Sequence, residues 1–487
     1  MRVLFVTSEI TPFSKTGGLA DVSEALPAAL AGLGCEVSVV SPLYRGAAAA
    51  LERLALPVET CDAPPVPIAG IPHPLQFRVV QRGGCALVFA VHDGFYDRRG
   101  LYGVPGGGDY GDNVARFTFL CRAALAWGTA RGGTDILHAN DWQTALSMAY
   151  LRAGFGGAPF AGARGVFTVH NLVYQGHAAA REILTTGLDW SWFHPGALEY
   201  YGGLNLMKAG LVFADALTTV SPTYAIEIQS PAAGNGLDGV LRAAGPRLHG
   251  ILNGIDTSAW NPATDPHLPA RFEVDDLSGK AACKQALQSA SGLPLAPEAL
   301  LLAAIGRFDW QKGMPLICDA FRRVAPLGAQ LVILGSGDPG IEGAVRELAR
   351  AYPRQVAATI GFDEGLAHRI EAGADAFLMP SAYEPCGLNQ MYSQRYGTVP
   401  IVHATGGLKD TVVDHDAARA AGRVGSGFSF TTFDGAHLAE AMLRAWRLYT
   451  HAPDEWRSLQ RACMRLDHSW ANSAREYLAL YESVAAL

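Results

Sequence analysis

The sequence has few charged residues and no basic cluster. Asp, Glu, Lys and Arg together make up 17% of the 487 residues, and 38 basic against 45 acidic side chains give a net charge of −7. Proteins that bind nucleic acids need Lys and Arg gathered on one surface. We therefore expect no nucleic-acid partner.

Long apolar runs are also missing. No stretch approaches the roughly 20 apolar residues that a membrane-spanning helix requires. The opening run Met1–Thr7 is apolar but too short for the central region of a signal peptide. We therefore expect no membrane partner and no export.

Cysteine is sparse and unpatterned. The eight cysteines include no CxxC pair, and a chain of this length does not need disulfides for stability. They predict reduced thiols and a cytoplasmic location. No His, Cys or Asp cluster has metal-ligand spacing, and neither a Gly-x-Ser-x-Gly motif nor a Walker loop is present. Metal and serine-hydrolase chemistry are disfavoured.

Short β-branched runs recur along the chain with helical segments between them, the pattern of parallel βαβ units. The first series comprises residues 2–7, 37–41, 86–91, 135–138, 165–169 and 216–220, and the second comprises 300–305, 330–334, 356–360, 376–379 and 399–403. Because a single core stops growing near about 250–300 residues, two Rossmann-like α/β domains are expected.

The segment between the two series contains turn signals. Asn253-Gly254 is followed by a stretch, residues 261–297, that is rich in Pro, Asp and Ser. We place the domain junction near residue 250. Residues 469–487 carry Tyr477, Leu480, Tyr481 and Val484 on one helical face, so we expect an amphipathic helix that packs on a domain.

Two glycine loops lie between a predicted strand and a predicted helix. They are residues 16–21 (TGGLAD), preceded by Lys15, and residues 405–410 (TGGLKD). Gly-Gly lets backbone amides approach a ligand, and a helix N-terminus carries partial positive charge, so each loop is a candidate anion or hydroxyl site. The alternative is a plain strand-to-helix turn.

Further polar side chains follow predicted strands, where ligands of open α/β sheets bind. Arg307 and Lys312 follow the run 300–305 and could hold a diphosphate. Glu384 follows the run 376–379 and could contact a sugar hydroxyl or developing positive charge. Asp141 and His170 follow two strands of the first series, although a lone histidine is usually a packing residue.

Taken in order, these motifs resemble those of bacterial glycogen synthases and plant starch synthases, which are retaining glucosyltransferases of GT-B architecture. The resemblance covers nearly the whole chain. It is carried by residues 15–22 (KTGGLADV), Asp112-Asn113 with Arg116-Phe117, 138–142 (HANDW), 168–171 (TVHN), 218–224 (TTVSPTY), 250–256 (GILNGID), 311–313 (QKG), 384–388 (EPCGL) and 405–408 (TGGL).

The resemblance implies transfer of glucose from ADP-glucose to the non-reducing-end 4-hydroxyl of an α-1,4-glucan, such as glycogen or a maltooligosaccharide, with no cofactor. It also implies two Rossmann-like domains facing across a deep interdomain cleft. Residues 1–250 would form the acceptor side and residues 251–468 the donor side, with the helix 469–487 packing back on the first domain.

The resemblance also implies roles for individual residues. The catalytic group would be Glu384, Lys312, Arg307, His170 and Asp141, with Arg307 and Lys312 on the diphosphate. The substrate-binding group would be Lys15, Gly17, Gly18, Asp21, Asn253, Phe362, Cys386, Gly387, Leu388, Thr405, Gly406 and Gly407. Phe362 would stack on the adenine, and the amides of Gly406 and Gly407 would face donor oxygens.

This chain departs from related transferases at several positions. Tyr392 stands eight residues after Glu384, where many related glycosyltransferases carry a second Glu, so we expect no covalent glucosyl-enzyme. Ala382-Tyr383, His403 and Asn140 also replace commoner residues.

Other functions are compatible with parts of the pattern. One alternative is a related transferase that uses UDP-glucose or a short maltooligosaccharide acceptor. An inactive glucan-binding protein would have lost Lys15, Lys312 or Glu384, all of which are present. Cys386 could equally be a packed thiol.

Overall fold

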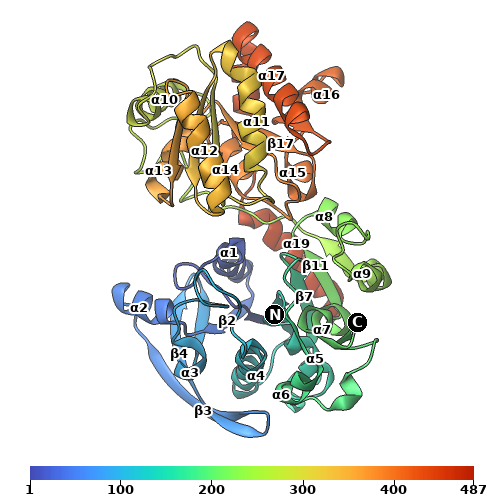
Figure 1. Ribbon diagram of the computed structural model, residues 1–487. Coiled ribbons are helices and arrows are strands. Elements are labelled where there is room, and N and C mark those ends of the chain that lie inside the picture. The colour runs from blue at the N-terminus through green and yellow to red at the C-terminus, as the bar shows by residue number, and fades with distance from the viewer. The chain divides into compact units, whose positions relative to one another are not determined.

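The computed structural model describes residues 1–487 and separates them into two compact units (Figure 1). Unit 1 comprises Met1–Gly254 together with Trp470–Leu487, and unit 2 comprises Ile255–Ser469. The chain therefore passes between the units twice, once after Gly254 and once after Ser469. Each unit is an α/β structure built on a largely parallel sheet.

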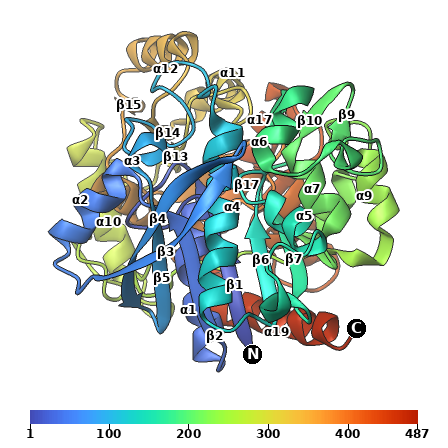
Figure 2. The ribbon, with the colours of Figure 1, turned by 90° about the horizontal axis from the view of Figure 1, so that it is seen from below.

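Unit 1 is built on a nine-stranded sheet of order β12-β11-β7-β6-β1-β2-β5-β4-β3 (Figure 2). The strands are β1 (Arg2–Val6), β2 (Glu36–Pro42), β3 (Glu59–Ile68), β4 (Ile71–Arg82), β5 (Cys85–Val91), β6 (Ile136–Asn140), β7 (Arg164–Val169), β11 (Ala216–Thr219) and β12 (Leu248–Gly250). All pairs are parallel except the β3–β4 and β4–β5 pairs.

The helices of unit 1 are α1 (Gly18–Gly32), α2 (Arg45–Arg53), α3 (Asp93–Tyr96), α4 (Asn113–Ala130), α5 (Leu146–Arg152), α6 (Ile183–Thr186), α7 (Leu206–Phe213), α8 (Pro222–Glu227), α9 (Asp238–Ala244) and α19 (Trp470–Ala485). A small separate sheet contains β8 (His177–Ala179), β10 (Gly203–Asn205) and β9 (Glu199–Tyr200).

Unit 2 is built on a six-stranded parallel sheet of order β15-β14-β13-β16-β17-β18. Its strands are β13 (Leu301–Ile305), β14 (Gln330–Gly335), β15 (Val356–Ile360), β16 (Ala376–Met379), β17 (Val399–His403) and β18 (Phe428–Phe430). Its helices are α10 (Ser278–Ala290), α11 (Met314–Val324), α12 (Pro339–Ala351), α13 (Glu364–Gly373), α14 (Asn389–Arg395), α15 (Gly406–Thr411), α16 (His415–Ala420), α17 (Gly435–His451) and α18 (Pro453–Met464).

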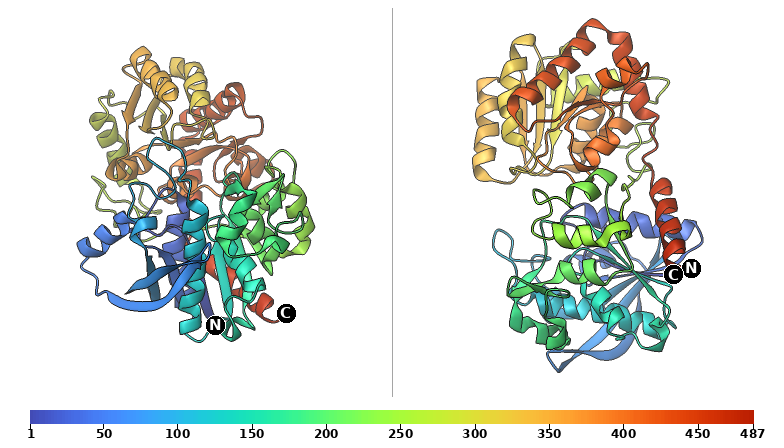
Figure 3. Two further views of the ribbon diagram at one scale, coloured as in Figure 1. Left: turned by 60° about the horizontal axis from the view of Figure 1, so that its bottom comes forward. Right: turned by 90° about the vertical axis from the view of Figure 1, so that its right-hand side faces the viewer.

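The C-terminal helix α19 belongs to unit 1, and Figure 3 shows it returning to the unit that holds the N-terminus. Tyr477 and Tyr481 are fully buried in the core of that unit. The hydroxyl of Tyr481 lies 2.6 Å from Nδ1 of the equally buried His138 on β6. The apolar face of α19 therefore completes the sheet packing of unit 1.

The antiparallel ribbon β3–β4 is the main element that the sequence did not predict. Strand β3 contains Pro64, Pro65 and Pro67, and proline is normally excluded from strands because it lacks an amide hydrogen. The strand tolerates them because it is the edge strand of the sheet, with an irregular register between Ala63 and Val66.

No helix of either unit is long and apolar enough to cross a membrane. The eight cysteines are all unpaired, and all except Cys61 are buried.

Candidate active site

Three neighbouring strands bring the predicted catalytic residues of unit 2 to one edge of the sheet. Arg307 and Lys312 follow β13, Glu384 follows β16, and the glycine loop of Gly406 and Gly407 follows β17. Since β13, β16 and β17 are adjacent and parallel, their carboxyl ends meet at the same edge. This is where ligands of open α/β sheets bind.

Lys312 and Glu384 form an ion pair at this edge. Nζ of Lys312 lies 2.5 Å from Oε2 of Glu384, and the hydroxyl of Ser381 donates to the same oxygen at 3.0 Å. The Glu384 side chain is 8% exposed and that of Lys312 is 24% exposed. The carboxylate is thus fixed from two sides, while the Lys312 side chain keeps part of its surface in solvent.

Arg307 extends into solvent beside this pair. Its side chain is 58% exposed and its guanidinium lies 3.3 Å from Oδ2 of Asp309. The other oxygen of Asp309 accepts the backbone amide of Lys312 at 2.9 Å. Asp309 therefore arranges both cations of the loop. Asp309 was not among the predicted site residues, although its position between Arg307 and Lys312 was a usable signal.

The second glycine loop packs closely on the Glu384 loop. A Cβ on Gly406, whose φ is +44°, would lie 1.9 Å from the carbonyl oxygen of Glu384, and one on Gly407 would lie 2.1 Å from that of Cys386. The Gly407 amide donates to the carbonyls of Glu384 and Pro385. The amide is thereby bonded within the chain, and its expected contact with donor oxygens stays a prediction. Both glycines permit the two loops to touch.

The remaining predicted residues of unit 2 lie on the same loops. Cys386 is buried, Gly387 has φ +72°, and Leu388 directly precedes α14. Thr405 directly precedes α15. Phe362 follows β15 and is 85% exposed, so its ring faces solvent rather than the core.

Tyr392 has a packing role in place of the second carboxylate of related enzymes. Its ring stacks on Trp260 at 4.0 Å between centroids, and Trp260 stacks on His368 at 3.9 Å on its other face. His368 in turn bonds the buried Asp265 at 2.7 Å. The tyrosine, which lies on α14, therefore belongs to an aromatic stack with Trp260 and His368.

In unit 1, Asp141 and His170 lie together at the carboxyl ends of β6 and β7. Asp141 has a left-handed backbone, φ +57°, and its Oδ1 accepts the His170 amide at 2.7 Å. Burial raises the pKa of Asp141 to about 7, although the amides of His170 and Asn171 lower it in part. The carboxyl group therefore changes charge near neutral pH, a property common at functional sites.

His170 is a neutral imidazole. Burial lowers its pKa to about 3. Its Nε2 lies 2.9 Å from Oδ1 of Asn140, whose amide nitrogen donates to the carbonyl of Val6. Because the Asn140 oxygen is an acceptor, Nε2 of His170 carries the hydrogen and Nδ1 keeps a lone pair. His170 can thus accept a hydrogen bond from a sugar hydroxyl.

The first glycine loop lies at the start of α1. Nζ of Lys15 pairs with Asp21 at 2.6 Å, and both side chains are partly exposed. Gly17 has an extended backbone, and a Cβ there would meet nothing within 4 Å. No packing within the chain requires glycine at this position. Its amide is already bonded to Glu9, a residue that the sequence analysis did not single out.

Asn253 directly precedes Gly254, the last residue of the segment Met1–Gly254 of unit 1. Its side chain is buried, and its Oδ1 has no hydrogen-bond partner. Buried polar atoms normally have partners, so this oxygen is an exception, and the expected substrate contact of Asn253 stays a prediction. His138, in contrast, is a packing residue: its two nitrogens bond Tyr481 and Thr168 at 2.6 Å, and burial lowers its pKa to about 3.

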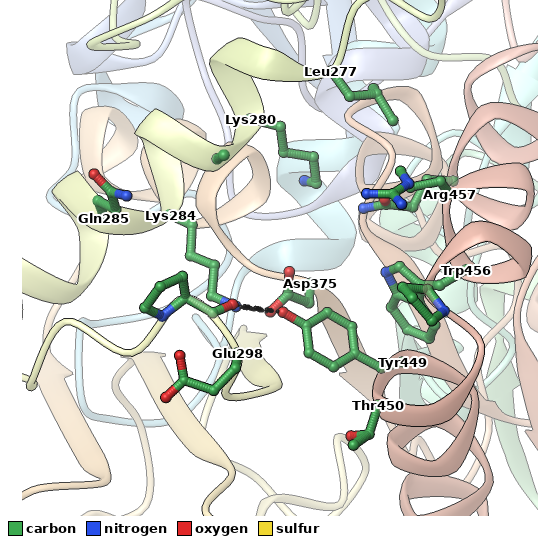
Figure 4. A pocket seen from close by; sticks show the side chains of 14 residues that line it. Leu277, Lys280, Lys284, Gln285, Glu298, Asp375, Tyr449, Thr450, Trp456 and Arg457 are labelled. Carbon is green, nitrogen blue, oxygen red and sulfur yellow. Dashed lines mark hydrogen bonds and ion pairs between the residues drawn. The ribbon is translucent and has the colours of Figure 1, made fainter.

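A cavity of about 430 Å³ in unit 2 lies at the opposite edge of the sheet, near the start of β16 (Figure 4). Lys284 pairs there with Asp375 at 2.7 Å and bonds the Tyr449 hydroxyl at 2.7 Å. Lys280 donates to the carbonyl of Ala372 near the end of α13. These lysines hold α10 on the sheet and belong to none of the predicted sites. No group of three or more His, Cys, Asp or Glu residues is arranged to hold a metal ion.

Comparisons with known proteins agree with the geometry of both units. Residues 2–243 match the family described as starch synthase catalytic domain, and residues 299–447 match glycosyl transferases group 1. A glycogen synthase of an Anaeromyxobacter species is 51% identical over 490 residues, covering 100% of both chains. The glycogen synthase of Myxococcus xanthus is 48% identical over 492 residues, again covering 100% of both.

Two solved structures share the architecture. The catalytic domain of starch synthase IV from Arabidopsis thaliana, bound to ADP and acarbose, matches with a TM-score of 0.89 and 33% identity. It covers 100% of this chain and 99% of its own. Sucrose-phosphate synthase from Thermosynechococcus elongatus matches with a TM-score of 0.60 and 17% identity over 100% and 99% of the two chains, a likeness of fold alone.

Proposed function

The chain belongs to the glycogen and starch synthase family of hexosyltransferases, with two Rossmann-like units of GT-B type, and we propose that it transfers glucose from ADP-glucose to an α-1,4-glucan. The observation that carries this proposal is the Lys312–Glu384 pair, held at the sheet edge beside Arg307. The Arabidopsis relative, solved with ADP and acarbose, supports a nucleotide donor and a glucan acceptor.

The two cations of unit 2 act on the diphosphate. The Arg307 side chain is exposed, and the Lys312 side chain is partly exposed. As the bond between the glucosyl C1 and the phosphate oxygen breaks, its electron pair leaves with ADP. Cations already in place stabilise that charge without rearranging. Phe362 offers its exposed ring to the adenine.

Sugar hydroxyls are the proposed ligands of polar side chains in each unit. In unit 2, Glu384 orients the sugar through its hydroxyls, and in unit 1 Nδ1 of neutral His170 accepts from a sugar hydroxyl. Ionised Asp141 stabilises positive charge that develops at C1 as the leaving group departs. The acceptor 4-hydroxyl oxygen forms the new bond to C1 on the face that ADP leaves, and its proton passes to the departing phosphate oxygen. The anomeric configuration is retained with no covalent glucosyl-enzyme and no cofactor.

The first glycine loop of unit 1 is a further proposed contact of the donor. Lys15 supplies a cation, Gly17 leaves space for the ligand, and Asp21 holds the lysine until the donor binds. Asn253 offers its unpartnered oxygen. We also propose a cytoplasmic location, because eight unpaired cysteines suit a reducing compartment.

Incorporation of labelled glucose into glycogen tests the proposed donor. We expect strong incorporation from ADP-glucose and at least about ten-fold lower kcat/KM from UDP-glucose. Equal or better use of UDP-glucose would overturn the donor assignment and favour the alternative. Absence of transfer from either nucleotide sugar to glycogen and to maltooligosaccharides, by folded protein, would overturn the transferase proposal.

A further inference from the structure

Glu9 is a buried carboxylate with an unusually complete set of donors. It follows β1 and is 3% exposed. Its Oε2 accepts the amides of Thr16 at 2.5 Å and Gly17 at 3.3 Å, and its Oε1 accepts the hydroxyls of Thr16 and Tyr102, both at 2.5 Å. Three of these four bonds come from the first glycine loop, so one side chain fixes the loop backbone.

The bonds of Glu9 also determine which backbone amides of the loop remain free to bind a ligand. Gly17 directly precedes the 15-residue helix α1 and has no side chain to cap it. The Glu9 carboxylate lies at this positive helix end instead. It accepts from the amides of Thr16 and Gly17, while those of Gly18 and Leu19 donate no hydrogen bond within the chain. The unused amides are therefore those of the first helical turn, next to Lys15.

Tyr102 connects Glu9 to a rigid polar network on α4. The Asn113 amide donates to the carbonyl of Tyr102 at 2.9 Å. Arg116 is fully buried and donates to Oδ1 of Asn113 at 2.7 Å and to the carbonyl of Leu101 at 2.8 Å. Asn113 and Arg116 belong to the sequence motif to which no role was assigned. Their place in the structure is to hold the segment that carries Tyr102.

We propose that Glu9 is a positioning residue for the nucleotide-sugar donor, acting through the loop of Lys15, Gly17 and Gly18. The inference rests on the proposed donor role of that loop. Glu9 does not contact the donor: its four bonds use both oxygens on the chain itself. Its charge matters because two of its partners are backbone amides, which can only donate, and because all four bonds are made to one carboxylate. In Glu9→Gln the N–H₂ can turn toward the two hydroxyls, which can also accept, but the neutral side chain no longer gives the amides of Thr16 and Gly17 a charge-assisted acceptor.

Steady-state kinetics with the full-length enzyme test the proposal. Glu9→Gln should raise the KM for ADP-glucose about ten-fold or more, the usual scale for losing a charge-assisted hydrogen bond in a buried site. Tyr102→Phe keeps the packing and loses one bond, so it should raise this KM about three-fold. Both variants should keep the KM for glycogen. The matched control is Glu24→Gln, which removes a half-exposed pair with Arg82 from α1 and should change neither KM.

A double variant separates a positioning role from a structural one. If Glu9 acts through the loop, Glu9→Gln combined with Lys15→Gln should raise the donor KM by less than the product of the single effects. A donor KM within two-fold of wild type in folded Glu9→Gln would overturn the inference, as would multiplicative effects. An unchanged donor KM in Lys15→Gln alone would instead reject the proposed role of the lysine. The role of Glu9 would then depend only on the donor KM of Glu9→Gln.

Discussion

Nζ of Lys312 and Oε2 of Glu384 lie 2.5 Å apart, although 72 residues separate them in the sequence. The pair exists because β13 and β16 are neighbours in the sheet of unit 2, so the loops that follow them meet. Glu384 is nearly buried, and the ammonium is its charge partner. Donor binding can draw the lysine toward phosphate while Ser381 keeps the carboxylate in place.

Lys312 and Glu384 should behave as one catalytic unit. We expect Lys312→Gln and Glu384→Gln each to lower kcat about 10²- to 10³-fold, the scale for losing one electrostatic contact to a transition state. The double variant should be little worse than the poorer single variant, because each change already breaks the pair. Turnover numbers at saturating donor and glycogen measure this. Multiplicative losses would show that the two residues act separately.

Apart from the three-residue strands β12 and β18, which it missed, the sequence predicted the parallel strands of both units to within two residues, because buried parallel strands are continuous apolar runs that end in polar residues. It also placed Arg307, Lys312 and Glu384 after their strands. It could not predict the Lys312–Glu384 contact or the Glu9 bonds, since these depend on which strands are neighbours. Strand β3 was missed because its prolines argue against a strand. The packing role of Tyr392 could not be predicted because its aromatic partner Trp260 lies more than a hundred residues away in the sequence.

Glycines of the two loops should respond differently to alanine. Gly406→Ala places a methyl group 1.9 Å from the carbonyl of Glu384 at a positive φ, so the loop must move. We expect at least a ten-fold lower kcat and a destabilisation of about 1–3 kcal/mol. Gly17→Ala meets no atom within 4 Å and should keep its melting temperature while raising the donor KM. Similar melting temperatures for both variants would contradict the close-packing explanation.

Asp141 should make stability depend on pH. Its folded-state pKa, about 7, lies above the unfolded value of about 3.9, so the native state retains the proton longer. The stabilisation from this proton is full below about pH 4 and is lost as pH rises to about 7. Asp141→Asn cannot ionise, so its unfolding midpoint in urea should increase relative to wild type between pH 5 and pH 8. A constant difference across that range would show that Asp141 is ionised throughout.

Phe362 should affect the donor without affecting the fold. Its ring is 85% exposed, so Phe362→Ala should leave the melting temperature unchanged. Stacking on a base is worth about 1–3 kcal/mol, which predicts roughly a ten-fold higher KM for ADP-glucose. Tyr201→Ala, at a side chain that is 89% exposed, is the matched control and should leave this KM unchanged. An equal KM for ADP-glucose in Phe362→Ala and wild type would show that the Phe362 ring does not contact the donor.

Tyr481→Phe should weaken unit 1 while leaving catalysis intact. The variant deprives the buried His138 of its 2.6 Å partner, which costs about 1–3 kcal/mol. Urea unfolding followed by circular dichroism should show an earlier transition, and kcat should equal that of wild type. The exposed Tyr201→Phe should show no shift. A loss of turnover in folded Tyr481→Phe would mean that α19 has a role in catalysis.

The most direct test is the rate of glucose transfer from ADP-glucose to glycogen by wild type and Glu384→Gln, measured beside ADP binding by calorimetry. We predict rapid incorporation by wild type, a loss of at least about a hundred-fold in the variant, and an ADP affinity within a few-fold of wild type. Wild-type turnover in folded Glu384→Gln would contradict the assignment of this sheet edge as the catalytic site.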